Sequence, residues 1–135
     1  MARYLLDATI VFAAASGELA TLAKLSRLSI GDVAISAIVY SELLSGMSGA
    51  ALAGGKSARL IENVTLVAQN VDILPYDRKA AEIFGELLRR IEPKRRRMLD
   101  RMVAAQAIAG GMTLVTLAPD DFSDIPGLKL ESWRT

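Results

Sequence analysis

Short apolar segments alternate with longer helical stretches along this chain. The short segments, which we interpret as strands, are Arg3–Asp7, Val33–Ile35, Val71–Leu74, Met112–Thr116 and Leu128–Leu130. Apolar strands that alternate with helices are typical of a parallel sheet covered on both faces. The sequence therefore predicts a three-layer α/β/α fold, with a central, mainly parallel sheet of four to five short strands flanked by helices. The length of 135 residues predicts a single domain, residues 1–135.

The helical stretches carry apolar residues at helical spacing. We predict helices at Thr9–Ala15, Leu19–Leu28, Ala37–Met47 and Lys56–Gln69, a fifth between Asp77 and Pro93, and a sixth from Asp100 to Ala109. The fifth has the clearest amphipathic stripe, whereas the sixth is apolar on nearly all sides. We therefore expect the sixth helix to be buried.

The chain contains no cysteine and no histidine. Disulfides, thiolate metal sites, cysteine nucleophiles, Ser-His-Asp catalysis and histidine-bound zinc are therefore excluded. If the protein is an enzyme, its chemistry must come from carboxylates, hydroxyls, Lys or Arg side chains, or a hard metal ion. The net charge of +1 also excludes a global polycation.

Hydrophobic residues make up 52% of the chain. No apolar run reaches the roughly 18 residues that a membrane helix needs. The first segment also lacks the charged start and the cleavage site of a secretory signal. We therefore expect a cytoplasmic protein with no membrane partner, whose apolar residues face a core or another protein.

Acidic residues occur at four places where apolar residues surround them. Asp7 ends the first strand, Glu42 lies in the helix Ala37–Met47, Asp100 opens the buried helix, and Asp120 and Asp121 follow the strand Met112–Thr116. In a doubly wound sheet, strand ends and helix starts gather on one rim. We therefore expect these carboxylates to converge.

Carboxylates that lie close together raise one another's pKa unless a cation neutralises them. Mg²⁺ or Mn²⁺ suits such a cluster because hard cations prefer oxygen ligands, and a metal ion can activate water without histidine. Plainer alternatives stay open for each acid. Asp7 and Asp100 fit simple helix N-caps, and Glu42 fits an ordinary, partly exposed helix residue.

A basic run, residues 94–97, precedes Asp100. Arg89, Arg90 and Arg101 are close to it in the sequence. Two interpretations stay open: a solvated helix end, where cations suit the negative pole of the dipole, or a surface that binds a phosphate backbone. In the second interpretation the RNA-binding candidates are Arg95, Arg96, Arg97 and Arg101.

Four motifs, LLDATI, SELLSG, DRMVAAQAIAGGMTLVT and DDFSDIPGLKLESW, together resemble those of PIN-domain ribonucleases. The resemblance is strongest to the VapC-type toxins of bacterial type II toxin–antitoxin pairs, and it spans nearly the whole chain. It implies that Asp7, Glu42 and Asp100 are catalytic residues and metal ligands. It also implies supporting polar roles for Thr9 and Thr116.

The fourth metal position departs from the family pattern. The family often has Thr-Asn-Asn or Thr-x-Asp after the strand, but here Leu117 and Ala118 follow Thr116. Asp121 matches the Asp-Phe element that comes next. Asp121, with Asp120 as the alternative, is therefore the expected fourth ligand, unless three acids suffice.

The resemblance implies a Mg²⁺-dependent (or Mn²⁺-dependent) endoribonuclease that cleaves RNA as the toxin of a pair. It also implies a homodimer and a VapB-type antitoxin, whose C-terminal segment lies across an apolar groove. Toxin–antitoxin hetero-oligomers are a further assembly that the resemblance allows. The helices Leu19–Leu28 and Lys56–Gln69 are the candidate walls of that groove. The alternative is a catalytically weak PIN-like module that binds RNA or an antitoxin without cleaving, which the residues Leu117 and Ala118 favour.

Overall fold

Five parallel strands form one central sheet in the computed structural model, which describes residues 2–45, 57–92 and 97–135. The strands are β1 (Tyr4–Leu6), β2 (Val33–Ser36), β3 (Asp72–Leu74), β4 (Thr113–Thr116) and β5 (Lys129–Ser132). Their order in the sheet is β3-β2-β1-β4-β5, and every neighbouring pair is parallel. The predicted fold class is confirmed, with a sheet that is wholly rather than mainly parallel.

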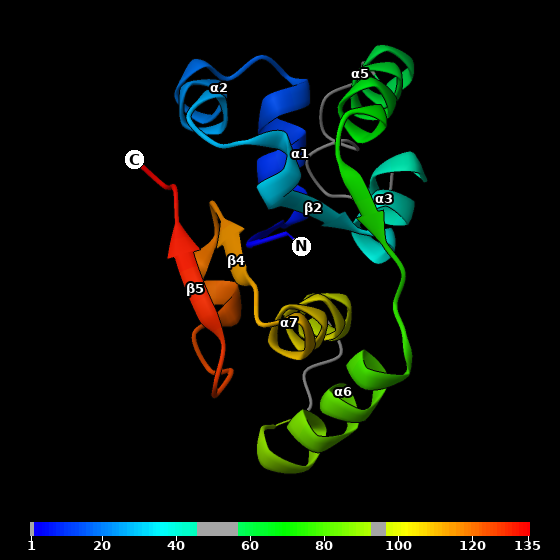
Figure 1. Cartoon of the computed structure of the whole chain (residues 1–135), viewed down its shortest axis with the longest axis vertical. Coiled ribbons are helices and arrows are strands. Elements are labelled where there is room, and N and C mark those ends of the chain that lie inside the picture. The colour runs from blue at the N-terminus through cyan, green and yellow to red at the C-terminus, as the bar shows by residue number, and fades with distance from the viewer. Residues whose placement is uncertain (1, 46–56, 93–96) are drawn as a thin grey trace.

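Helices cover both faces of this sheet (Figure 1). They are α1 (Ala8–Ala15), α2 (Leu19–Ser26), α3 (Ala37–Leu44), α5 (Ser57–Gln69), α6 (Arg78–Arg90) and α7 (Met98–Gly110). Helices α1, α2, α3 and α5 pack on one another on one side, and α6 packs on α7 on the other. Because α7 lies between the sheet and α6, its residues from Val103 to Ala107 are buried, as predicted, whereas Leu99 in its first turn is exposed.

The register of the strands brings their carboxyl ends together. Leu6 of β1 pairs with Ile35 of β2 and with Val115 of β4. The amide of Asp7 continues this ladder by donating to the carbonyl oxygen of Val115 at 3.1 Å. The residues that follow β1 and β4, which are far apart in the sequence, therefore lie side by side at one rim.

Most element boundaries agree with the sequence to within a few residues. The second helix ends at Ser26 rather than Leu28, and the third ends at Leu44, whereas residues 46 and 47 lie outside the described residues. Within the described ranges, no single helix is long and apolar enough to cross a membrane. Helices α1 and α2 meet that length and composition only as a pair, with a bend of 106° between them.

Candidate active site

Asp7 is the most enclosed acid of the rim, with only 5% of its surface exposed. It is the N-cap of α1, and its Oδ1 atom accepts a hydrogen bond from the Ile10 amide at 3.1 Å. The plainer interpretation of Asp7 as a helix cap is therefore correct. A cap hydrogen bond uses only part of the capacity of a carboxylate, so capping leaves a second role open.

Two threonine hydroxyls converge on the same carboxylate. Thr9 Oγ1 donates to Asp7 Oδ1 at 2.6 Å, and Thr116 Oγ1 donates to Asp7 Oδ2 at 2.5 Å. Each hydroxyl oxygen also accepts a hydrogen bond from a backbone amide of the segment after β4. The Leu117 amide donates to Thr9 Oγ1, and the Ala118 amide donates to Thr116 Oγ1, both at 2.9 Å. The amides occupy hydroxyl lone pairs, so the hydroxyl hydrogens are directed at Asp7.

Burial raises the pKa of Asp7 above its usual range. The hydrogen bonds from Thr116, Thr9 and the Ile10 amide act in the opposite direction, but they do not cancel the effect of burial. A carboxylate that is buried this far is stabilised in its charged form by a cation placed next to it.

Glu42 and Asp100 belong to the same electrostatic neighbourhood. Glu42 is half-buried on α3, and burial, followed by the charge of Asp7, raises its pKa. Asp100 lies in the first turn of α7, and its pKa is raised to about 7. Burial is the main cause, and the charges of Asp121, Asp7 and Glu42 add to it. The structure therefore brings together acids from four separate elements.

The structure distinguishes between the two acids of the 3₁₀ turn η3 (Pro119–Phe122). The charge of Asp121 raises the pKa of Asp100, and Asp121 forms an ion pair with Arg97, so it faces the acidic rim. The side chain of Asp120 is 85% exposed and pairs with Arg134 at 3.7 Å. This placement favours Asp121 over Asp120 as the fourth acid. Ala118 precedes the turn and contributes backbone groups alone: its amide donates to Thr116 Oγ1, and its carbonyl oxygen accepts from the Asp121 amide at 3.1 Å.

Asp100 is not a helix N-cap, which corrects one of the plainer alternatives. The N-cap position of α7 is occupied by Arg97, whose side chain makes no cap hydrogen bond. Arg97 instead pairs with Asp121, and its Nη1 atom lies 3.9 Å from Asp100 Oδ2. The sequence did not predict this contact, because a basic run next to an acid is compatible with either a solvated or a paired arginine.

Arg101 corrects another prediction, because its side chain is fully buried. Its Nη1 and Nη2 atoms donate to Asp124 at 3.3 and 2.9 Å, and Nη2 also donates to the carbonyl oxygen of Glu92 at 3.1 Å. A guanidinium held in this way presents no surface to RNA. Of the other arginine candidates, Arg97 is described, whereas Arg95 and Arg96 lie outside the described residues.

The donor set of the rim fits a divalent cation such as Mg²⁺, since it consists of partly desolvated carboxylate oxygens with raised pKa values. In residues 2–45, 57–92 and 97–135, however, no three acidic side chains are arranged to hold a metal ion as they stand. Their present partners are two threonine hydroxyls and one arginine. The threonines hold both oxygens of Asp7, and Arg97 pairs with Asp100 and Asp121.

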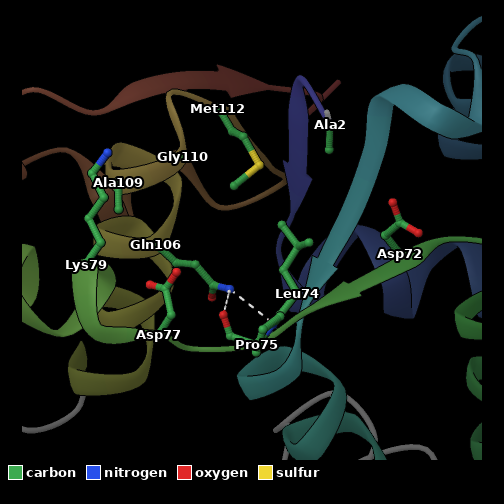
Figure 2. A pocket seen from close by; sticks show the side chains of 10 residues that line it. All are labelled: Ala2, Asp72, Leu74, Pro75, Asp77, Lys79, Gln106, Ala109, Gly110 and Met112. Atoms are coloured by element: carbon green, nitrogen blue, oxygen red, sulfur yellow. Dashed lines mark hydrogen bonds between the residues drawn. The ribbon is translucent and has the colours of Figure 1, made fainter.

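One cavity is lined by an acid of the rim, and another is not. One of about 440 Å³ is lined by Glu42 together with Ile38, Ser41, Ser45 and Leu99, so it adjoins the acidic rim. Another, of about 480 Å³, is shown in Figure 2. It includes residues that precede β1 and β4, and there Gln106 donates to the carbonyl oxygens of Leu74 and Pro75, both at 3.0 Å. None of the four acids of the rim lines this second cavity.

Comparisons with known proteins agree with this architecture. The sequence profile of the PIN domain matches residues 4–128. The chain is 33% identical to a protein named ribonuclease VapC2 from Rickettsia felis, over 75% of this chain and 74% of the relative. It is 25% identical to a protein named tRNA(fMet)-specific endonuclease VapC from Shigella flexneri, over 98% of this chain and 99% of the relative.

Solved structures show the same fold. A chain of VapBC2 from Rickettsia felis, bound to a promoter DNA fragment, has a TM-score of 0.79 with 27% identity, covering 96% of this chain and 98% of that one. A chain of DNA-bound VapBC from Salmonella typhimurium has a TM-score of 0.78 with 24% identity, over 98% and 99%. The predicted nuclease class is confirmed at the level of the family. The chain therefore belongs to the PIN domain family, and its relatives are of the VapC type.

Proposed function

We propose that this PIN-domain protein is a Mg²⁺-dependent endoribonuclease that acts in the cytoplasm as the toxin of a toxin–antitoxin pair. One observation carries the proposal: Asp7, Glu42, Asp100 and Asp121 come from four elements, and their charges act on one another around Asp100. Mn²⁺ is the expected substitute metal. The nuclease names of the VapC relatives support the reaction class.

In this proposal Asp7, Glu42 and Asp100 hold the divalent cation, with Asp121 as the fourth acid. A divalent cation at this place supplies Lewis-acid polarisation of a phosphoryl oxygen and lowers the pKa of water. Thr9 and Thr116 orient the Asp7 carboxylate through their hydroxyl hydrogens. Arg97, which is 40% exposed, is the described arginine that can reach an RNA phosphate at the rim.

The test is RNA cleavage by the purified chain with Mg²⁺ or Mn²⁺, compared with its Asp7→Asn and Asp100→Asn variants. We expect cleavage to stop in EDTA and in both variants, while the variants keep the circular dichroism spectrum of the folded chain. The matched control is Asp120→Asn, which removes an acid from the same turn as Asp121 but on the exposed side. Cleavage that persists in EDTA contradicts the proposal.

A second candidate function is a PIN-like module that binds RNA or an antitoxin without cleaving. The observation that favours it is the present side-chain arrangement, in which no three acids of the described residues are set to hold an ion. It predicts RNA retention that weakens as salt rises, with no metal-dependent turnover. Metal-dependent cleavage by the wild-type chain excludes it.

We further propose a homodimer and a VapB-type antitoxin as partners, since solved relatives are VapBC complexes. The antitoxin segment has a candidate groove of about 450 Å³, lined by Phe12 and residues 15–17 of the α1 end and by Arg59, Leu60 and Asn63 of α5. The lining of this cavity includes α5, one of the two helices expected as walls, and the end of α1, and it includes no residue of α2, the other expected wall. The leucines Leu19 and Leu22 of α2 are exposed, at 82% and 39%.

A further inference from the structure

Arg97 places a positive charge next to two of the proposed metal ligands, Asp100 and Asp121. Its guanidinium pairs with Asp121 Oδ1, and its Nη1 atom lies 3.9 Å from Asp100 Oδ2. The electrostatic effect is consistent with this geometry, because Arg97 opposes the influences that raise the pKa of Asp100. A single side chain therefore neutralises part of the charge that burial and crowding make costly.

A guanidinium and a small, hard cation compete for the same two carboxylates. Mg²⁺ needs close, direct contacts with oxygen, about 2.0–2.1 Å long. A bound guanidinium occupies that space and adds a positive charge next to the incoming ion, so the two cations repel each other. On the basis of the proposed function, we propose that Arg97 is a built-in competitor that lowers the affinity of the site for its divalent cation.

The position of Arg97 makes this competition reversible. Its side chain is 40% exposed, and that of Asp121 is 31% exposed, so the ion pair is partly solvated and weak. Arg97 is also the N-cap residue of α7 without capping the helix through its side chain. The guanidinium can therefore leave the carboxylates without breaking the fold, and a substitution at position 97 removes no helix cap.

The experiment measures Mn²⁺ affinity by electron paramagnetic resonance of the free ion, using the full chain and its Arg97→Gln variant. Removing one positive charge a few ångströms from a divalent ion is expected to tighten binding roughly tenfold. The matched control is Arg134→Gln. Arg134 pairs with Asp120, the neighbour of Asp121 that points to solvent, so this variant makes the same change of net charge away from the proposed ligands. We expect its affinity to change by less than about twofold.

A second measurement uses the wild-type chain alone. The side-chain ¹⁵N resonance of Arg97 is followed while Mg²⁺ is added, and we expect it to shift and sharpen as the guanidinium is released. A resonance that stays unchanged at saturating Mg²⁺ overturns the inference, as does Mn²⁺ affinity that is equal or weaker in Arg97→Gln, or equally raised in Arg134→Gln.

The two proposals fail in different ways. If the wild-type chain cleaves RNA with Mn²⁺ and Arg97→Gln binds the ion no more tightly, only the role of Arg97 is wrong. If the wild-type chain binds no Mn²⁺, the proposed function fails and the inference fails with it.

Discussion

Asp100 gives the protein a pH-dependent stability that follows from a raised pKa. Its carboxyl titrates near pH 7 in the folded chain, compared with an ordinary value of 3.8. Well below pH 3.8 the carboxyl is protonated in both the folded and the unfolded state, so its ionisation does not change the free energy of unfolding. As the pH rises from about 4 to 7, ionisation is easier in the unfolded state, so the free energy of unfolding decreases.

We therefore expect Asp100→Asn to be more stable than the wild-type chain at pH 8 and equally stable at about pH 3. Because the side chain is 34% exposed, solvent screening reduces the difference at pH 8 to the order of 1 kcal/mol. Urea unfolding without divalent cations, at both pH values, measures it. The exposed Asp120→Asn variant serves as the control, and a loss of stability in Asp100→Asn at pH 8 contradicts the prediction.

A substitution of Thr116 can change the pKa of Asp7 while the carboxylate itself is kept. Thr116→Val keeps the shape of the side chain but removes a buried hydrogen bond to Asp7 Oδ2 and the acceptor of the Ala118 amide. We expect a loss of about 1.5–3 kcal/mol in the free energy of unfolding. The pKa of Asp7 should also rise, so the acid limb of the pH–activity profile moves to higher pH.

Thr116→Ser is the matched control, because it restores the hydroxyl with only a methyl group missing. It should return the acid limb to the wild-type position. If Thr116→Val leaves the profile where it is, Thr116 has only a packing role.

At this scale the sequence indicated that the acids lie on one rim, but it did not indicate the contacts of the arginines. Asp7 and Asp100 were recognisable because an acid stands out next to an apolar strand or helix. The pairing of Arg97 and the burial of Arg101 depend on how a turn after β4 approaches α7. That approach joins segments more than 20 residues apart, and no local pattern encodes it.

Arg101 acts at the scale of elements, since it connects α7 to two neighbouring segments. Through Asp124 it holds the segment after η3, and through the Glu92 carbonyl it holds the segment after α6. Asp100 and Asp121 lie on two of the connected parts. Because a buried ion pair is weak support for stability, its main effect here should be on the relative position of these two acids.

We expect Arg101→Met to lower the free energy of unfolding by about 1–2 kcal/mol, since the partly exposed Asp124 stays hydrated. Mn²⁺ affinity should fall at least about tenfold, because a displacement of about 1 Å is costly in a site of this kind. The control is Asp77→Ala, which removes the N-cap of α6 and costs about 1 kcal/mol outside the site. Equal metal affinity in the two variants contradicts the positioning role.

The elements themselves were predictable, because apolar strands and helix starts follow local rules. Ser36 and Asp77 are residue types that favour N-caps, and each accepts the hydrogen bond that defines one, from the amides of Ile38 and Ala80 respectively. Helix ends were less predictable. The second helix stops at Ser26, before its apolar pattern ends at Leu28, because the chain turns there with a backbone bond from the Leu28 amide to the Leu25 carbonyl.

At the scale of the whole molecule, the groove between α1 and α5 is the surface on which the proposed antitoxin depends. Leu60 lines this groove, whereas Leu66 of the same helix is 54% exposed and does not line it. We expect Leu60→Glu to weaken binding of the C-terminal antitoxin segment by at least about tenfold, because it buries a charge in the interface. Leu66→Glu should bind normally, and isothermal titration calorimetry with a synthetic segment compares them. Equal weakening in both variants contradicts this location.

The sequence predicted a parallel sheet, but it did not predict the order of the strands. Alternating strands and helices predict a parallel sheet, but they do not say that β1 lies in the centre between β2 and β4. That order places Asp7, at the end of β1, next to β4. Only the packing of the assembled layers determines it.

The hydrogen bond between Asp7 and Thr116 joins residues 109 positions apart. During synthesis, β1 emerges early and waits for its neighbour β4, which comes near the end of the chain. Asp121 comes later still, so the four acids of the rim come together only after residue 121 has left the ribosome. In the proposed function, a chain that terminates before β4 lacks both Thr116 and Asp121, so it carries an incomplete metal site and should not cleave RNA.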